Sequence, residues 1–341
     1  MAKPISNPPN RFERVHVQWD EDAPSPDARL EVFEERAKSY LTENESPDVP
    51  FRFGINPYRG CQHACTYCYA RRTHPFIGFG AGTDFDKKIV VKVNAPELLR
   101  RELNSGKARG ELVGVSGVTD PYQPLESHYR LTRRSIAELL RFENPIGIVT
   151  KSSLVARDID LLQKFKKTHP AKVFISTPFF DMKLARLIEP GAPTPELRFK
   201  ALRRLAEAGI ETGIAIAPVI PGLNDREIPK LLAAAKDAGV RSAFTILLRL
   251  PGEVEAVFED RLRESLPGHA NKVLSALKEM RPQRGQRPGE RMRGSGARWD
   301  TIEALFRTSC RRLGIRYGEE QELLPLADAA KTQKPRQGEL F

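Results

Sequence analysis

Short apolar runs rich in β-branched residues recur along the middle of the chain, and each is followed by a polar turn and a segment with helical periodicity. This alternation is typical of parallel βα units. A further strand-like run, KKIVVKV (87–93), leads into a helix that begins near Pro96. The predicted strands of the βα series are FRFGIN (51–56), ELVGVSGV (111–118), IGIVT (146–150), KVFIST (172–177), GIAIAPV (213–219) and SAFTILL (242–248).

Helix signals separate these runs. Thr194 and Pro195 begin one helix and Gly209 ends it, and another helix follows Asn224. Six βα units with right-handed crossovers build most of a parallel barrel. We therefore expect an α/β fold, a partial parallel (β/α)6 TIM-like barrel over residues 51–250, in preference to a doubly wound sheet.

The flanking segments differ from this core. Residues 1–50 are polar and proline-rich, which predicts an extended or disordered lead-in. Residues 251–326 predict a helical, Arg-rich C-terminal extension, with two helices near 255–280 and a last one from Asp300 to Leu313. Residues 327–341 predict a disordered tail.

Composition narrows the class of protein. The chain has 341 residues, of which 40% are hydrophobic and 29% charged, and no apolar run approaches the ~20 residues of a membrane span. The N-terminus lacks the apolar segment of a secretion signal. We therefore expect a soluble protein in the cytoplasm.

The net charge of +11 is unevenly distributed. Fourteen basic and only five acidic residues lie between Arg261 and Arg316. Such a surface attracts polyanions, most simply nucleic acid, because each neutralised phosphate releases counterions. A merely solubilising basic face explains the same excess, and charge alone does not separate the two.

Three of the four cysteines, Cys61, Cys65 and Cys68, form a C-x3-C-x2-C motif directly after the first strand. Three thiolates hold three irons of a 4Fe-4S cube and leave the fourth iron open. The alternative is a zinc site completed by His63 or His74. Zinc motifs usually add a distant second cysteine pair, which this sequence lacks, so we favour the cluster.

Polar residues also gather where the predicted strands end, the face on which barrel active sites form. Ser116, Thr119 and Asp120 follow the second strand, Lys151 follows the third, and Ser176 ends the fourth. A lysine meets a carboxylate as a compact charge, and hydroxyl groups bond to amino or ribose groups. These residues predict a binding site for a polar ligand beside the cysteines.

The run CQHACTYCY matches the C-x3-C-x-aromatic-C signature of the radical S-adenosyl-L-methionine (SAM) superfamily. Within that superfamily the chain resembles the spore photoproduct lyase-like, or DNA repair photolyase-like, group. This resemblance rests on the cysteines and on GVSGVTDPYQPLE (114–126), IVTKSS (148–153) and APVIPGLND (217–225). It implies a 4Fe-4S cluster whose open iron chelates SAM. It further implies Tyr67 beside the adenine, Lys151 on the SAM carboxylate and Ser176 at the ribose.

The sequence departs from the family at two places. The Gly-Gly-Glu run that receives the SAM amino group in many members is absent, so the acceptor is open between Ser116, Thr119 and Asp120. In the loop that follows, Tyr122 and Glu126 either face the substrate or pack within the loop. The hydrogen-donor cysteine of spore photoproduct lyases is also missing near the end of the second strand.

The resulting expectation is a radical SAM enzyme that receives an electron from a reducing donor and cleaves SAM to a 5′-deoxyadenosyl radical. Its substrate is unidentified, and nucleic acid held by residues 261–316 is one candidate. Two alternatives stay open. One is a cluster- or zinc-stabilised nucleic-acid-binding protein without turnover, and the other is a radical SAM enzyme with a protein or small-molecule substrate.

Overall fold

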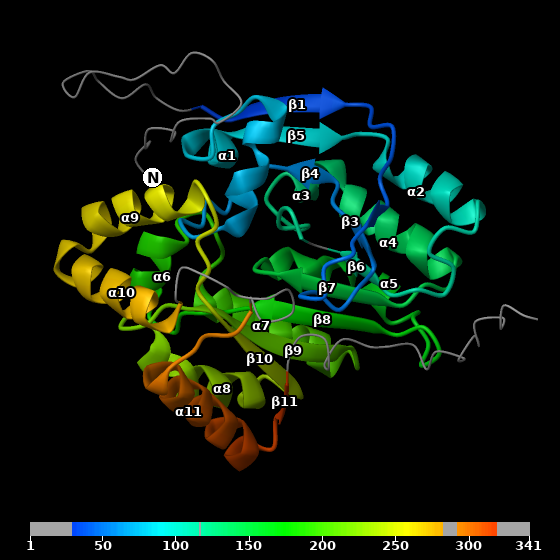
Figure 1. The fold of residues 1–341 in the computed structure, drawn as a ribbon. Helices are drawn as coiled ribbons and strands as arrows, with labels where there is room; N and C mark the ends of the chain where they lie inside the picture. The colour runs from blue at the N-terminus through cyan, green and yellow to red at the C-terminus, as the bar shows by residue number, and fades with distance from the viewer. Residues whose placement is uncertain (1–28, 116, 282–291, 319–341) are drawn as a thin grey trace, which may run out of the picture.

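Eight strands form the main sheet of this computed structural model, which describes residues 29–115, 117–281 and 292–318. Their order is β11, β10, β9, β8, β7, β6, β3, β2, and all neighbours pair in parallel except β2 with β3. Within these residues β2 and β11 do not pair with each other, so the sheet is open (Figure 1). The strands are β2 (Thr42–Glu43), β3 (Phe53–Ile55), β6 (Val113–Val115), β7 (Ile146–Thr150), β8 (Ala171–Ser176), β9 (Glu211–Val219), β10 (Ser242–Leu247) and β11 (Arg316–Tyr317).

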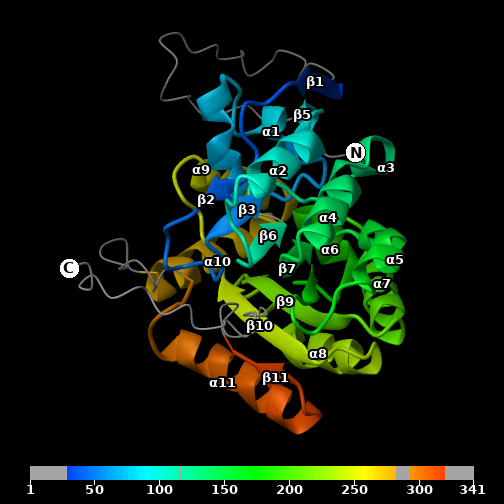
Figure 2. The same ribbon diagram turned by 90° about the vertical axis from the view of Figure 1, so that its right-hand side faces the viewer.

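The six strands expected from the apolar runs, β3 and β6 to β10, lie side by side in chain order. This arrangement confirms the predicted partial (β/α)6 barrel. Helices follow the strands and lie along one side of the sheet (Figure 2), and Thr194 caps α7 as expected, accepting a hydrogen bond from the Leu197 amide. These helices are α2 (Ala95–Asn104), α4 (Leu131–Arg141), α5 (Ile159–Leu162), α7 (Pro195–Glu207) and α8 (Ile228–Asp237).

A small aromatic cluster fills the other face of the sheet. The rings of Phe174 and Phe244 meet at 4.9 Å, with Phe51 packed beside them. Two glycines make room for these rings: a Cβ on Gly213 would lie 2.1 Å from Phe174, and one on Gly114 would lie 2.6 Å from Phe51. Along the strands, these rings lie on the amino-terminal side of the polar residues at the carboxyl ends.

A second, three-stranded sheet includes part of the N-terminal lead-in. It has the order β1, β5, β4, with β1 (Glu31–Glu35) parallel to β5 (Lys88–Lys92) and β4 (Tyr58–Arg59) antiparallel to it. Tyr40 and Leu41 are buried against the barrel. Residues 29–50 of the predicted lead-in are thus extended in part, as the strands β1 and β2, and the β5 backbone supplies the hydrogen bonds that order β1. Residues 1–28 lie outside the described part of the chain.

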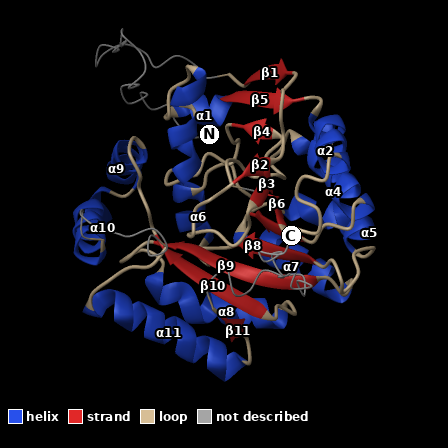
Figure 3. Ribbon diagram, turned by 45° about the vertical axis from the view of Figure 1, so that its right-hand side comes forward, coloured by secondary structure: helices blue, strands red, loops and turns tan. Residues whose placement is uncertain are grey.

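The C-terminal extension is helical, as the periodicity indicates. Helices α9 (Val254–Ser265) and α10 (Pro267–Met280) pack on each other, and α11 (Ala297–Leu313) packs on α8 (Figure 3). Among the described residues we find no helix with the length and apolarity needed to span a membrane. The expected tail, 327–341, and most of the Arg-rich loop lie outside the described residues. The remaining elements are α1 (Thr83–Lys87), α3 (Glu126–Tyr129), α6 (Met182–Ile188) and the 3-10 helices η1 (Tyr69–Thr73), η2 (Pro75–Ile77), η3 (Ser153–Asp158) and η4 (Asp225–Glu227).

Candidate functional site

The three clustered cysteines lie in one loop between β4 and η1. Cys61 and Cys65 are buried, Cys68 is partly buried, and all three are free thiols. Burial raises the pKa of each thiol, and for Cys61 and Cys65 the neighbouring thiols add to this rise. The three sulfur atoms are thus close enough to interact electrostatically. A bound cluster would replace their protons, because iron takes thiolate ligands.

The structure bears on the zinc alternative. Within the described residues no three His, Cys, Asp or Glu side chains come close enough together to ligate one metal ion. His63 Nδ1 lies 3.3 Å from Asp120, and His74 Nε2 lies 3.0 Å from the Lys88 carbonyl oxygen. A structural zinc needs four ligands around one point, whereas a cube spreads its thiolates over separate irons.

One buried arginine that sequence reasoning missed fixes the cysteine loop. Arg71 is 1% exposed and donates to the carbonyl oxygens of Cys65 (3.0 Å), Ala81 (3.0 Å) and Gly82 (2.8 Å) and to Asp86 (2.6 Å). Burial raises the pKa of the Asp86 carboxyl, and the Arg71 charge opposes that rise. Arg71 therefore ties the middle of the loop to the segment that leads into α1.

A second set of side chains, which we call the Glu189 group, lies beside the cysteines. It consists of the buried Tyr67, Glu189 and Arg198 and the half-buried Lys151. Glu189 accepts hydrogen bonds from the Tyr67 hydroxyl and from Arg198 Nη2 (2.5 Å). Lys151 Nζ lies 3.9 Å from Glu189 Oε1 and 5.5 Å from the centre of the Tyr67 ring. Burial lowers the pKa of Lys151, but Cys65 and Glu189 outweigh it and raise this pKa above its ordinary value. The lysine is therefore a charged ammonium next to the cysteine loop.

Asp120 organises the loops that follow β6 and β7. Its carboxylate accepts hydrogen bonds from the Thr150 hydroxyl (2.6 Å), the Lys151 amide (2.7 Å) and the Tyr122 amide (2.9 Å). Burial alone would raise the pKa of Asp120, but His63 and these donors lower it to about 2. The ionised carboxylate thus holds the backbone of the candidate SAM lysine.

The other expected contacts have local partners. The Thr119 hydroxyl lies 3.4 Å from the Tyr58 carbonyl oxygen, and the Ser176 hydroxyl donates to the Ala217 carbonyl oxygen at 2.9 Å. Both serine and threonine are buried. Ser116 lies outside the described residues. Arg198 of the Glu189 group also donates to the Ser176 carbonyl oxygen at 2.9 Å, and Asp120 bonds the Lys151 amide, so the structure brings Tyr67, Lys151, Ser176 and Asp120 together.

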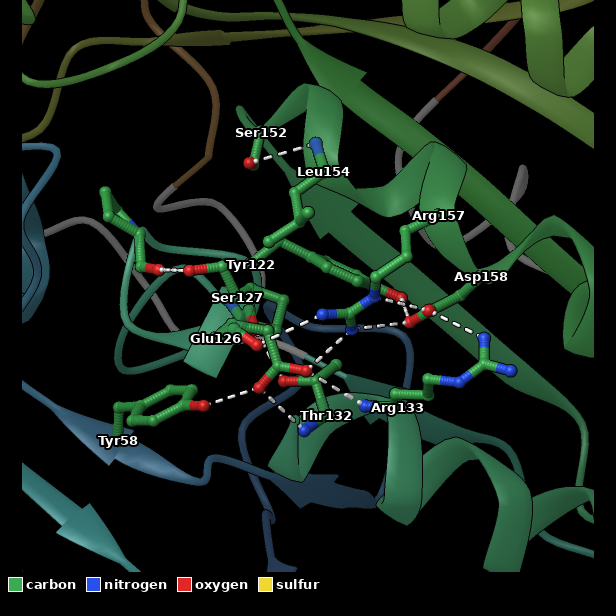
Figure 4. A network of polar contacts seen from close by, with 12 residues as sticks. Tyr58, Tyr122, Glu126, Ser127, Thr132, Arg133, Ser152, Leu154, Arg157 and Asp158 are labelled. Carbon is green, nitrogen blue, oxygen red and sulfur yellow. Dashed lines mark hydrogen bonds and ion pairs between the residues drawn. The ribbon is translucent and has the colours of Figure 1, made fainter. Parts of the chain in front are cut away.

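Tyr122 and Glu126 belong to a separate network, which we call the Glu126 network (Figure 4). Both side chains are fully buried. Glu126 accepts hydrogen bonds from the Tyr58 hydroxyl (2.5 Å), Arg157 (2.9 Å) and two backbone amides of α4, while the Tyr122 hydroxyl donates to Asp158 (3.1 Å). Neither residue is available to a substrate. The members of this network are Tyr58, Tyr122, Glu126, Arg133, Arg157 and Asp158.

Comparison with known proteins identifies the family. Residues 55–235, more than half of the chain, match the model of the radical SAM superfamily. The chain therefore belongs to the radical SAM superfamily, whose members use a 4Fe-4S cluster and SAM. This assignment confirms the resemblance that the cysteine motif indicates, and with it the expected cofactors.

Two relatives illustrate the spread of the family. An uncharacterised protein of Mycobacterium tuberculosis is 38% identical over 212 residues, which are 62% of this chain and 62% of that protein. The radical SAM Nα-GlyT isomerase of Pseudomonas phage M6 is 30% identical over 169 residues, 49% of this chain and 33% of the isomerase. The chain thus spans less than two thirds of the length of the mycobacterial relative.

Among solved structures, spore photoproduct lyase in complex with a dinucleoside spore photoproduct has a TM-score of 0.62. The match covers 84% of this chain and 81% of the lyase, at 17% sequence identity. At that identity the likeness establishes a shared fold.

The residues of this chain fit both cofactors of the family. Three free thiols share one loop beside the barrel edge, and a charged lysine lies 3.9 Å from the buried carboxylate of Glu189.

Proposed function

We propose that this protein is a radical SAM enzyme in which Cys61, Cys65 and Cys68 hold the cluster and Lys151 binds the SAM carboxylate. When bound, the reduced cluster supplies one electron that cleaves a carbon–sulfur bond of SAM, and the resulting 5′-deoxyadenosyl radical abstracts a hydrogen atom from substrate. The observation that carries the proposal is the position of Lys151, a half-buried ammonium that follows β7 and lies beside Tyr67 of the cysteine loop.

The chain's own residues divide the remaining work. Lys151 attracts the SAM carboxylate, the Tyr67 ring lies against the bound nucleoside, and the Ser176 hydroxyl contacts the ribose. Asp120 acts through the loop and not on the SAM amino group, because its oxygens already accept three hydrogen bonds. Ser116 and Thr119 remain the candidates for that amino group.

A non-catalytic cluster protein is the weaker alternative. A cluster that only stabilises a loop requires no charged lysine beside it, whereas the Lys151 ammonium lies 3.9 Å from Glu189 and makes no hydrogen bond within the described residues, so its donors are open to a ligand. The Glu189 group is therefore better explained by a ligand that carries a carboxylate. SAM supplies that carboxylate.

Nucleic acid is our finer proposal for the substrate. It is supported by the concentrated basic charge between Arg261 and Arg316 and by the dinucleoside photoproduct bound to spore photoproduct lyase, the structural neighbour. A protein or small-molecule substrate remains the rival. Turnover also requires a reducing electron donor, which a chemical reductant replaces in the test below.

The decisive experiment is anaerobic reconstitution followed by an assay for 5′-deoxyadenosine. We expect about four irons and four sulfides per chain and 5′-deoxyadenosine formation after reduction in the presence of SAM. Cys61→Ala should lose the cluster and the formation of 5′-deoxyadenosine. Cys310→Ala, which removes the buried thiol of α11, should keep the cluster and this activity. Stoichiometric zinc in protein purified without oxygen, or an iron cluster that never yields 5′-deoxyadenosine, would refute the proposal.

A further inference from the structure

Glu189 is a fully buried carboxylate that sequence reasoning missed. It lies directly after α6, in a segment that carries no recognisable motif. Its side chain is the centre of the Glu189 group. Its partners are separated widely along the chain: Tyr67 precedes it by 122 residues. A buried acid is retained only when its neighbours compensate the loss of water. Here three polar side chains do so.

Each partner of Glu189 leads to a different part of the proposed SAM site. Tyr67 belongs to the cysteine loop, and Lys151 follows β7. Arg198, which is 1% exposed, also donates to the Ser176 carbonyl oxygen at 2.9 Å, at the end of β8. One carboxylate therefore connects the cluster loop with two strand ends.

The backbone around Glu189 is fixed to the same loop. The Thr66 amide donates to the Ile188 carbonyl oxygen at 3.0 Å, and the Gly191 amide donates to the His63 carbonyl oxygen at 3.0 Å. A Cβ on Gly191 would lie 2.1 Å from the Gln62 carbonyl oxygen, so only glycine permits this approach. Glu189 thus has little freedom to move relative to the cysteines.

The charges of the group do not cancel. Arg198 and Lys151 carry two positive charges and Glu189 one negative charge, and Arg198 bonds Glu189 directly while Lys151 remains 3.9 Å away. The Lys151 ammonium makes no hydrogen bond to any residue in the described part of the chain. Among Lys151, Arg198 and Glu189 one positive charge is therefore in excess; the thiolates of the neighbouring cysteine loop are not part of this count.

We propose that Glu189 is a positioning residue that holds the Lys151 ammonium over the Tyr67 ring, where it receives the SAM carboxylate. The inference rests on the proposed SAM site. Glu189 itself touches neither SAM nor the cluster. Without its charge, Lys151 and Arg198 are two cations that repel each other, and the long flexible lysine side chain moves away from the site. SAM binding is then weaker, because part of its free energy is used to return the Lys151 side chain to the site.

The test combines two variants with two ligands. SAM binding to the anaerobically reconstituted protein is measured by equilibrium dialysis for wild type, Glu189→Gln, Lys151→Ala and the double variant. The same set is measured with decarboxylated SAM, which lacks the carboxylate. We expect Glu189→Gln to weaken SAM binding by about tenfold, to leave decarboxylated SAM unaffected, and to have no further effect in the Lys151→Ala background.

A structural role for Glu189 gives a different pattern. Equal weakening of SAM and decarboxylated SAM, an effect that persists without Lys151, unchanged SAM affinity, or tighter SAM binding would each overturn the inference. The proposed function fails separately, if wild type does not bind SAM or if Lys151→Ala binds it normally. Because Glu189→Gln leaves Arg198 without a counter-ion, Glu189→Asp is the second variant.

Glu189→Asp keeps the charge and the fold but withdraws the carboxylate by one methylene. We expect it to weaken SAM binding by about threefold, between wild type and Glu189→Gln, and again only for the ligand that carries a carboxylate. The electron paramagnetic resonance spectrum of the reduced cluster gives an independent readout. The change that SAM produces in this spectrum should require more SAM in both variants, and an unshifted titration would contradict the proposal.

Discussion

Two buried charge networks border the same barrel edge, and they differ in their balance. In the Glu126 network, the buried carboxylates of Glu126 and Asp158 face the guanidinium groups of Arg133 and Arg157 at 2.8–2.9 Å, and Arg133 also pairs with the exposed Asp160. In the Glu189 group two cations share one carboxylate. Every cation of the Glu126 network has a carboxylate within hydrogen-bond distance, whereas the Lys151 ammonium has none among the described residues, so an anionic ligand completes its contacts. Charge balance therefore separates the scaffold from the site more clearly than burial does.

The largest effect should come from breaking the balanced network. Glu126→Gln removes the negative charge that faces Arg157. It also places an amide N–H group where, in the wild type, a carboxylate oxygen accepts a hydrogen bond from Tyr58 or Arg157. We expect the free energy of unfolding to fall by about 3–5 kcal/mol, as when one partner of a buried ion pair is removed. Urea denaturation of the metal-free protein measures this loss.

A matched control uses an exposed ion pair. Glu97 bonds Arg134 at 2.6 Å, but the two side chains are 57% and 49% exposed. Glu97→Gln should cost less than about 1 kcal/mol. If the two substitutions destabilise the protein equally, burial and balance do not distinguish the Glu126 network from the surface.

Removing the surplus charge should affect binding and spare stability. Lys151→Ala leaves Glu189 and Arg198 as a neutral pair, so the unfolding free energy of SAM-free protein should change by less than about 1 kcal/mol. SAM binding should weaken by about 1.5–3 kcal/mol, because a charge-assisted contact is lost. Cluster content should stay at the wild-type level. A large loss of stability without a loss of SAM affinity would make Lys151 part of the scaffold.

The parts of this architecture differ in how far the sequence predicts them. Each strand of the barrel has its own apolar run and the helices between them have their own periodicity, with a local cap at Thr194, so six βα units are visible locally. Strand β1 is not visible in the local sequence, because it is ordered by pairing with β5, more than fifty residues later in the chain. Glu189 and Arg71 are invisible for the same reason. Their roles depend on tertiary partners, while the cysteine spacing and Lys151 are recognisable in the linear motif.

Acid should reveal a further difference in burial. The pKa of Asp120 is lowered to about 2 from its ordinary 3.8 by His63 and its hydrogen-bond donors. A carboxyl whose folded pKa is depressed stabilises the protein above its unfolded pKa, and this stability is lost as the pH falls through the folded value. Asp120 should contribute about 2 kcal/mol near neutral pH, lost between about pH 4 and pH 2. Asp120→Asn should remove this part of the pH dependence of urea unfolding.

Asp160 provides the comparison, since its pKa is also lowered to about 2, by hydrogen bonds from Arg133. Asp160 is 56% exposed, whereas the Asp120 side chain is 9% exposed. Salt screens exposed charges far more than buried ones. High salt should therefore abolish the effect of Asp160→Asn and leave that of Asp120→Asn. Equal salt sensitivity would show that Asp120 is solvated.

The smallest effect concerns nucleic acid and tests which arginines of the basic region contact phosphate. Many described arginines of the basic region already bond acids: Arg263 with Glu259, Arg298 with Glu279, Arg307 with Glu303 and Arg316 with Glu211. The sequence between Met280 and Gly294 adds arginines with one acid; most of this stretch lies outside the described residues. If nucleic acid binds, we expect its affinity to fall steeply with salt, with a log–log slope near −0.7 to −0.9 per phosphate contacted.

Two quadruple variants of equal charge then separate the surfaces. Replacing Arg284, Arg287, Arg291 and Arg293 by Ser should flatten the slope by up to about one unit per arginine that contacts phosphate. Replacing Arg263, Arg298, Arg307 and Arg316 by Ser should flatten it less, because a carboxylate already neutralises each of them. Binding is measured on single- and double-stranded DNA and on transfer RNA across a salt series. Equal flattening by both variants would show that only total charge matters, and salt-independent or absent binding would remove nucleic acid as the substrate.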